Sequence, residues 1–325
     1  MTTLDFALVQ PKDLQAAIAA RRDNPESRFV AGGTDLLVNL RHGIGEPTQL
    51  IDLSGIDELG CVKATLAGLR IGAGVKLAKV SGLPLICERY RAVCEAASAV
   101  AGPGHRALGT VGGNLCLDTR CVYYNQSEWW RSANGYCLKR QGEVCHVAPQ
   151  GQRCHAAFTG DLAPALLVLG AEVEIVGPQG RRRIPLADLY VEDGRAHLTL
   201  APDEIVATVL LPPDPAPSTY AKVRVRGAID YPLAGVAVAL SVADGVAQRL
   251  RIALTGTNSR PFILAGTDAL IGRPVDADAL HEIERLVQKQ VQPMRTTVVS
   301  AQYRRLAASG LARRLVTKLA EAQAA

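Results

Sequence analysis

Four of the eight cysteines of this chain lie in one segment, residues 117–160. Between successive members stand 15, 7 and 8 residues, and the four are Cys121, Cys137, Cys145 and Cys154. The segment has few Leu, Ile or Val residues, and ordering its backbone costs about 1–2 kcal/mol per residue. Four thiolates around a metal centre would stabilise it, because metal-binding free energy then acts as folding free energy. We therefore predict that these four cysteines are metal ligands.

Two kinds of metal centre suit four thiolates, an iron–sulfur cluster and structural zinc. The spacing matches no standard ferredoxin run, but it also lacks the Cys-x₂₋₄-Cys pair that zinc sites usually contain. His146 and His155 directly follow two of the cysteines and could compete as ligands. We predict a [4Fe-4S] cluster, with structural zinc and unmetallated thiols as the alternatives. We expect Cys61, Cys87 and Cys94 to be small core residues.

Two glycine pairs suit a different chemistry, the binding of phosphate. The first lies in a run that follows an expected strand and opens a helix, made of Phe29, Val30, Ala31, Gly32, Gly33, Thr34, Asp35 and Leu36. The second lies in the run Thr110, Val111, Gly112, Gly113 and Asn114. Glycines let backbone N–H groups approach a phosphate closely, so the two runs could hold the two phosphates of one dinucleotide. Neither run matches the Rossmann fingerprint or a Walker A loop, and ordinary tight turns are the alternative.

The elements around these runs indicate mixed α and β structure. The hydrophobic spacing predicts helices over residues 12–22, 83–101, 161–169, 276–290 and 300–322. It predicts strands near residues 29–31, 49–53, 69–75, 172–176, 182–184, 203–211, 220–226, 233–242 and 248–255. The proline-rich stretch of residues 212–217 marks a linker. We expect an N-terminal subdomain over residues 1–55, a second subdomain over residues 56–216 that contains the cysteine segment, and a C-terminal domain over residues 217–325.

The two glycine runs, with the helix that begins at Asp161, resemble the FAD-binding subunits of the xanthine dehydrogenase and carbon monoxide dehydrogenase family of molybdenum hydroxylases. The resemblance covers nearly the whole chain. It implies an α+β fold of the vanillyl-alcohol-oxidase-like (PCMH) type, with a C-terminal domain of antiparallel sheet plus helices. It also implies that the first run wraps the FAD pyrophosphate and that the second binds the same group or the adjacent ribose. Asp161 would accept a hydrogen bond from the adenosine side, and Lys222 would contact the isoalloxazine, with a solvated strand lysine as the alternative.

The cysteine segment departs from this family, in which the chain between the second glycine run and the Asp161 helix is short. With a [4Fe-4S] cluster on its flavin subunit, the chain resembles the β subunits of 4-hydroxybenzoyl-CoA reductases. That resemblance implies a complex, a dimer of heterotrimers, with a molybdenum-cofactor subunit and a [2Fe-2S] subunit. Ferredoxin would supply electrons for reductive dehydroxylation to benzoyl-CoA, and no residue of this chain would act on the substrate. The alternatives are the medium subunit of an oxidative hydroxylase that reduces NAD or a quinone, and a zinc-stabilised FAD protein.

The short stretches of chain at both ends of the cysteine segment limit how far the cysteines can lie from the expected flavin site. Asn114 precedes Cys121 by seven positions, and Cys154 precedes Asp161 by seven. An extended chain spans at most about 3.6 Å per residue, which places the outer cysteines within roughly 25 Å of flavin-binding backbone.

Composition sets the remaining expectations. Hydrophobic residues make up 48% of the 325 residues and the net charge is +5, which fits a globular protein with a substantial core and no nucleic-acid module. The first residues lack a basic stretch followed by an apolar run, and no apolar segment approaches the length of a membrane span. We expect a cytoplasmic protein without membrane contact.

Overall fold

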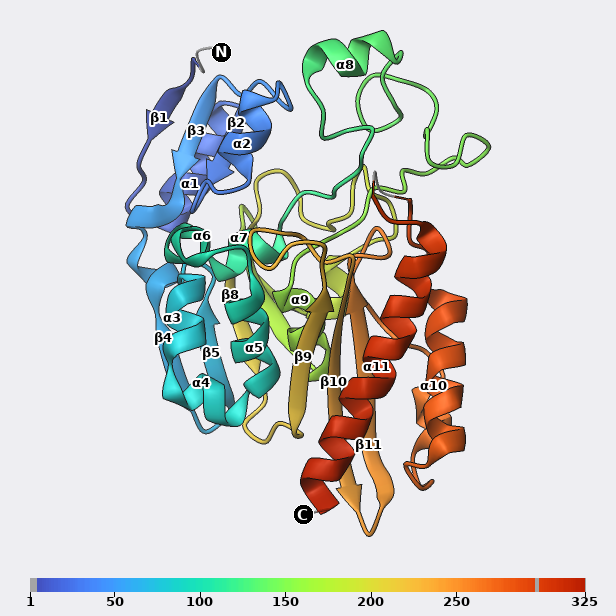
Figure 1. The fold of residues 1–325 in the computed structure, drawn as a ribbon. Helices are drawn as coiled ribbons and strands as arrows, with labels where there is room; N and C mark the ends of the chain where they lie inside the picture. The colour runs from blue at the N-terminus through green and yellow to red at the C-terminus, as the bar shows by residue number, and fades with distance from the viewer. Residues whose placement is uncertain (1–4, 296–297, 325) are drawn as a thin grey trace.

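The computed structural model describes residues 5–295 and 298–324. Residues 1–4, on which the expectation of no leader partly depends, lie outside them. The described residues form three sheets, and helices pack against them (Figure 1).

The first sheet is parallel and carries the first glycine run at its edge. Its strand order is β1-β3-β2, and its elements are β1 (Ala7–Val9), α1 (Leu14–Asp23), β2 (Ser27–Val30), α2 (Leu36–Arg41) and β3 (Gln49–Asp52). Helix α1 begins where the Asp13 side chain accepts a hydrogen bond from the Ala16 backbone N–H at 2.8 Å. It buries Leu14 and Ile18 against the core. After β2 the chain passes through the glycine run directly into α2.

The second sheet is antiparallel, in the order β4-β5-β8-β6-β7. Its strands are β4 (Val62–Thr65), β5 (Gly68–Gly72), β6 (Glu172–Gly177), β7 (Gly180–Pro185) and β8 (Ile205–Leu211). The helices of this region are α3 (Leu77–Gly82), α4 (Pro84–Arg89), α5 (Arg91–Ala99), α6 (Pro103–Leu108), α7 (Val111–Leu115) and α9 (Leu162–Val168). Short 3₁₀ helices are η1 (Leu53–Gly55), η2 (Asp57–Gly60), η3 (Leu186–Leu189) and η4 (Thr267–Leu270).

The third sheet is antiparallel, in the order β12-β11-β10-β9, and both of its faces are covered. Its elements are β9 (Ser218–Val223), β10 (Ala234–Ala243), β11 (Val246–Thr255), β12 (Phe262–Ile263), α10 (Ala277–Gln290) and α11 (Ala301–Ala324). Alternate residues of β10 enter different cores, because successive side chains of a strand point to opposite faces. Val236 and Val238 pack with residues of α10 and α11, whereas the small Ala237 and Ala239 pack on the side of the buried helix α9.

The helix predicted over residues 83–101 is interrupted. It divides into α4 and α5 at Tyr90, whose hydroxyl donates to the Pro212 carbonyl at 2.7 Å. Cys87 and Cys94 form a disulfide across this break. These two cysteines, expected in the core, are half-buried and bonded to each other, with Cys94 packed against the main core, whereas Cys61, also expected to be buried, is exposed.

The cysteine segment has largely irregular backbone, as its composition indicates, with one short helix, α8 (Glu128–Ala133). Figure 1 shows it in green above the body of the molecule, beside the first sheet. A buried guanidinium holds it together: Arg131, 1% exposed, donates to the carbonyls of Gln126 at 2.6 Å and Gly43 at 2.8 Å and pairs with Glu128. Because Gly43 follows α2, this arginine also fastens the segment to the first subdomain. No helix among the described residues has the length and apolarity to cross a bilayer.

Candidate functional site

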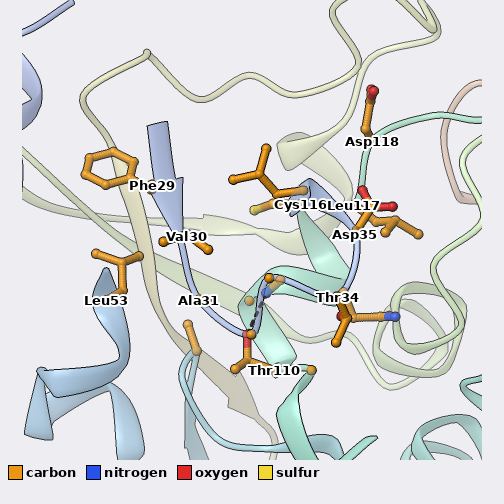
Figure 2. A pocket seen from close by; sticks show the side chains of 18 of the residues that line it. Phe29, Val30, Ala31, Thr34, Asp35, Leu53, Thr110, Cys116, Leu117 and Asp118 are labelled. Carbon is orange, nitrogen blue, oxygen red and sulfur yellow. Dashed lines mark hydrogen bonds between the residues drawn. The ribbon is translucent and has the colours of Figure 1, made fainter. Parts of the chain in front are cut away.

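A cavity of about 1110 Å³ lies where the first sheet, helix α7 and the loop of residues 229–231 between β9 and β10 meet. Most residues of the two glycine runs line it: Phe29, Val30, Ala31, Gly32, Gly33, Thr34, Asp35, Leu36, Thr110, Gly112, Gly113 and Asn114. Figure 2 shows the β2–α2 loop passing beside Thr110, with Asp118 from the start of the cysteine segment at the same cavity. Two runs that are about 80 positions apart in sequence are thus brought to one site. Val111 is instead buried in the core.

Glycine is required where the two runs touch. A Cβ on Gly32 would lie 2.2 Å from the Leu108 carbonyl oxygen, so only glycine lets the β2–α2 loop rest on the chain before α7. Gly33 has φ +67°, the left-handed region that glycine adopts without strain. The second run is the start of α7 and not a free turn, because the Thr110 hydroxyl accepts from the Gly113 N–H at 3.1 Å. A volume above the usual 300–1000 Å³ or so of ligand pockets suits a dinucleotide with two ring systems.

Asp161 reaches the cavity wall but is engaged within the protein. It is 3% exposed, accepts from the Tyr220 hydroxyl at 2.6 Å and pairs with Lys222 at 3.0 Å. Burial raises the pKa of Asp161, and the Lys222 ammonium and the Tyr220 hydroxyl oppose that shift. Lys222 itself is not a lining residue; it also donates to the carbonyl of Asp230, which is one. This buried pair positions the 229–231 loop over the cavity.

Several lining residues carry no sequence signal that we could use. Among them are Lys76, His105, Arg195 and Tyr231, which come from four separate parts of the chain. Arg120 was also missed; it is not a lining residue, but its side chain joins Tyr231 to the segment of residues 35–39, which also lines the cavity. It pairs with Asp35, donates to Asn39 at 3.0 Å and to the Tyr231 hydroxyl at 2.8 Å, and lies over the Tyr231 ring at 4.7 Å.

The four predicted cysteine ligands surround a second, much smaller cavity. Cys121, Cys137, Cys145 and Cys154 all line it, and its volume of about 10 Å³ is the room of one water molecule. Cys137, Cys145 and Cys154 are 8%, 5% and 5% exposed. Folding thus gathers four thiols from a segment of irregular backbone into one desolvated place.

Two of these thiols, those of Cys121 and Cys154, favour the protonated form in the absence of a cation. Burial raises the pKa of Cys121 to about 12 and that of Cys154 to about 11, and the neighbouring thiols of the group add to both shifts. Burial likewise raises the pKa of Cys116 to about 12, which makes it an inert thiol. A bound metal centre would reverse this preference at its ligands, because coordination deprotonates a thiol.

Neither histidine is a ready ligand. His146 lines the small cavity, but its Nε2 is 2.5 Å from the Tyr136 carbonyl oxygen, and His155 is not a lining residue. Within residues 5–295 and 298–324, no three His, Cys, Asp or Glu side chains are arranged to hold one metal ion. The structure therefore brings the four thiols to one small cavity, but no donors among the described residues are spaced to hold a single metal ion.

Comparisons with known proteins agree with the flavin cavity. Residues 4–214 match the family described as the FAD binding domain in molybdopterin dehydrogenase, and residues 218–319 match the CO dehydrogenase flavoprotein C-terminal domain. The aldehyde oxidoreductase FAD-binding subunit PaoB of Escherichia coli (strain K12) is 34% identical, over 81% of this chain and 84% of its own. The carbon monoxide dehydrogenase medium chain of Afipia carboxidovorans is 25% identical, over 96% of both chains.

Solved structures show the same fold. Quinoline 2-oxidoreductase from Pseudomonas putida 86 superposes with a TM-score of 0.80 over 99% of both chains at 22% identity. A Cu,Mo-CO dehydrogenase chain superposes with a TM-score of 0.81, also over 99% of both chains, at 23% identity. The expected PCMH-type fold is confirmed. The chain belongs to the family of FAD-binding medium subunits of the xanthine dehydrogenase and carbon monoxide dehydrogenase type of molybdenum hydroxylases.

Proposed function

We propose that this chain carries FAD in the large cavity and an iron–sulfur cluster between the four thiols, and that it relays electrons within a molybdenum enzyme complex. The observation that carries the proposal is the convergence of Cys121, Cys137, Cys145 and Cys154 on one cavity next to the flavin cavity. FAD exchanges one or two electrons, and an iron–sulfur cluster moves one at a time. The chain's own residues would bind and orient both groups and exclude water from them.

A cluster fits these donors better than a single ion does. In a zinc site four sulfurs lie about 2.3 Å from one ion, and no such grouping is present among the described residues. In a [4Fe-4S] cluster each thiolate binds its own iron, so the sulfurs stand farther apart around a larger centre. Seating it would require the small cavity to widen from its volume of about 10 Å³, and the backbone on either side of α8 is irregular.

Backbone groups are already placed to favour thiolate sulfur. The Ala156 N–H donates to Cys154 Sγ at 3.4 Å, and a backbone hydrogen bond from Tyr123 lowers the pKa of Cys121 against burial. Hydrogen bonds of this kind stabilise cluster sulfurs and help to set the reduction potential. The Tyr123 ring packs on His146 at 5.2 Å and helps to shield the cavity from water.

The partners follow from the family. We infer a molybdenum-cofactor subunit and a [2Fe-2S] subunit, with substrate chemistry on the former. The two relatives named above are subunits of an aldehyde oxidoreductase and of a carbon monoxide dehydrogenase, and these names favour an oxidative enzyme whose electrons leave through this chain. The second candidate is a 4-hydroxybenzoyl-CoA reductase, in which ferredoxin supplies electrons in the opposite direction, and the four-thiol cavity favours it.

Metal and flavin analysis of the full-length chain, reconstituted with FAD, iron and sulfide, tests the proposal. We expect one FAD and about four iron per chain, and an electron paramagnetic resonance signal on reduction. One zinc and no iron would refute the cluster, and no bound FAD would refute the flavin site. In the purified complex, reduction of NAD or a quinone by an aldehyde supports the oxidative enzyme, whereas reduction by ferredoxin with NADH inert supports the reductase.

A further inference from the structure

Tyr124 and Lys139 stand between the two cavities. Among the described residues, they are the pair that lines both the flavin cavity and the four-thiol cavity. Both belong to the cysteine segment, and Lys139 follows the proposed ligand Cys137 by two positions. Whatever charge this wall carries therefore acts on both cofactor sites at once.

The ammonium of Lys139 is fixed in that wall. Its side chain is 4% exposed, and Nζ donates to Asp118 Oδ1 at 2.7 Å, to the Thr119 carbonyl at 3.0 Å and to the Thr119 hydroxyl at 2.5 Å. Nζ also lies 4.4 Å from the centroid of the Tyr124 ring. A lysine with only a structural role usually extends its charged end to water, and this one does not.

Charge inside a protein acts over longer distances than charge in water, because the surroundings screen it less. Lys139 lines the small cavity together with all four cysteines, so its charge stands at the place where the cluster would bind. Asp118 carries the opposite charge and faces the same flavin cavity. The two therefore form a dipole at the wall, in which the ammonium is 4% and the carboxylate side chain 33% exposed.

We propose that Lys139 is a positioning residue that raises the reduction potentials of both the cluster and the flavin, and that Asp118 moderates this effect. The inference rests on the proposed function, because it assigns a role toward the cofactors that the two cavities would hold. Each centre gains an electron on reduction and no bond in the wall changes. A fixed cation stabilises that added negative charge on either side, and a fixed carboxylate opposes it.

The test is a potentiometric titration of the reconstituted full-length chain, followed optically for the flavin and by electron paramagnetic resonance for the cluster. Lys139→Met removes the charge and keeps the length of the side chain, and it should move both midpoint potentials to more negative values. Lys139→Arg retains the charge and should restore them. Asp118→Asn leaves the ammonium uncompensated and should move both potentials to more positive values. Lys63→Met, on the exposed strand β4, is the matched control and should leave both potentials unchanged.

The two substitutions should shift the midpoint potentials in opposite directions, which a general folding defect would not do. If Lys139→Met does not fold, Asp118→Asn still decides, and a potential that does not rise there overturns the inference. Unchanged potentials in a fully loaded Lys139→Met chain overturn it as well. If the wild-type chain binds no iron, the cluster part of the proposed function fails, and the flavin potential alone decides whether Lys139 acts on its neighbouring cofactor.

Discussion

Replacing Arg120 with alanine should weaken FAD binding without unfolding the chain. Arg120 lies at the start of the cysteine segment, where its backbone pairs with Ala157, but the partners of its side chain belong to other parts of the flavin site. It pairs with Asp35 of the first glycine run, donates to Asn39 at 3.0 Å, and holds Tyr231 by a 2.8 Å hydrogen bond and a 4.7 Å contact with the ring. Asp35, Asn39 and Tyr231 all line the flavin cavity.

The size of the effect follows from these contacts. Hydrogen bonds to a charged group contribute about 1.5–3 kcal/mol each, and an exposed cation–π contact about 0.5 kcal/mol. Two such hydrogen bonds and one ring contact give about 3.5 kcal/mol at the low end. The Arg120 and Asp35 side chains are 17% and 21% exposed, so water replaces part of what is lost. We expect about 2 kcal/mol, which is a loss of about 30-fold in FAD affinity.

The assay is the Kd of the apoprotein for FAD, measured by flavin fluorescence, together with the difference in Tm between the holo and apo forms. Arg120→Lys keeps a cation without the forked guanidinium and should fall between wild type and alanine. Arg285→Ala, which breaks an exposed pair with Glu282 on α10, is the matched control. Wild-type FAD affinity in Arg120→Ala, with an unchanged Tm difference, would refute the reasoning.

Four further predictions use other parts of the molecule. Cys137→Ser should lose cluster iron and keep FAD by metal and flavin analysis, whereas Cys61→Ser, an exposed free cysteine, should keep both; loss of FAD with iron retained would show that the roles are reversed. Gly113→Val should lose FAD and keep the cluster iron, because Gly113 lines the flavin cavity and a side chain there would occupy ligand space. The fold should tolerate the change, since a Cβ at this position would meet only the Thr110 hydroxyl, at 3.0 Å. Denatured, metal-free chain should titrate six thiols before reduction and eight after it, since Cys87 and Cys94 are paired; eight thiols at both stages would contradict the disulfide. Burial lowers the pKa of His197 from 6.5 to about 4, so below pH 6.5 the unfolded chain binds a proton that the folded chain does not, and the folded state loses stability as the pH falls. The unfolding free energy should therefore decrease by about 2 kcal/mol from pH 7 to pH 5. Urea titrations should show that His197→Asn removes that decrease.

Much of the architecture could be predicted from local patterns. The boundaries of α1, α10 and the β10–β11 hairpin follow from hydrophobic spacing and from capping or turn residues such as Asp13 and Asp276. Where the pattern was ambiguous, tertiary contacts decided. The chain breaks its helix at Tyr90, whose hydroxyl reaches Pro212 over 122 positions, and no local rule contains that partner.

The sequence by itself determined the composition of the site: two glycine runs that allow close backbone approach, and four thiols in a segment too poor in apolar residues to form its own core. Only the tertiary structure decided that the runs share one cavity, that the thiols converge on another, and that Lys139 and Tyr124 stand between them. The physical reason is that residue types and short spacings act locally. The wall between the cavities depends instead on contacts such as Arg131 with Gly43, 88 positions apart, and Arg120 with Tyr231, 111 positions apart.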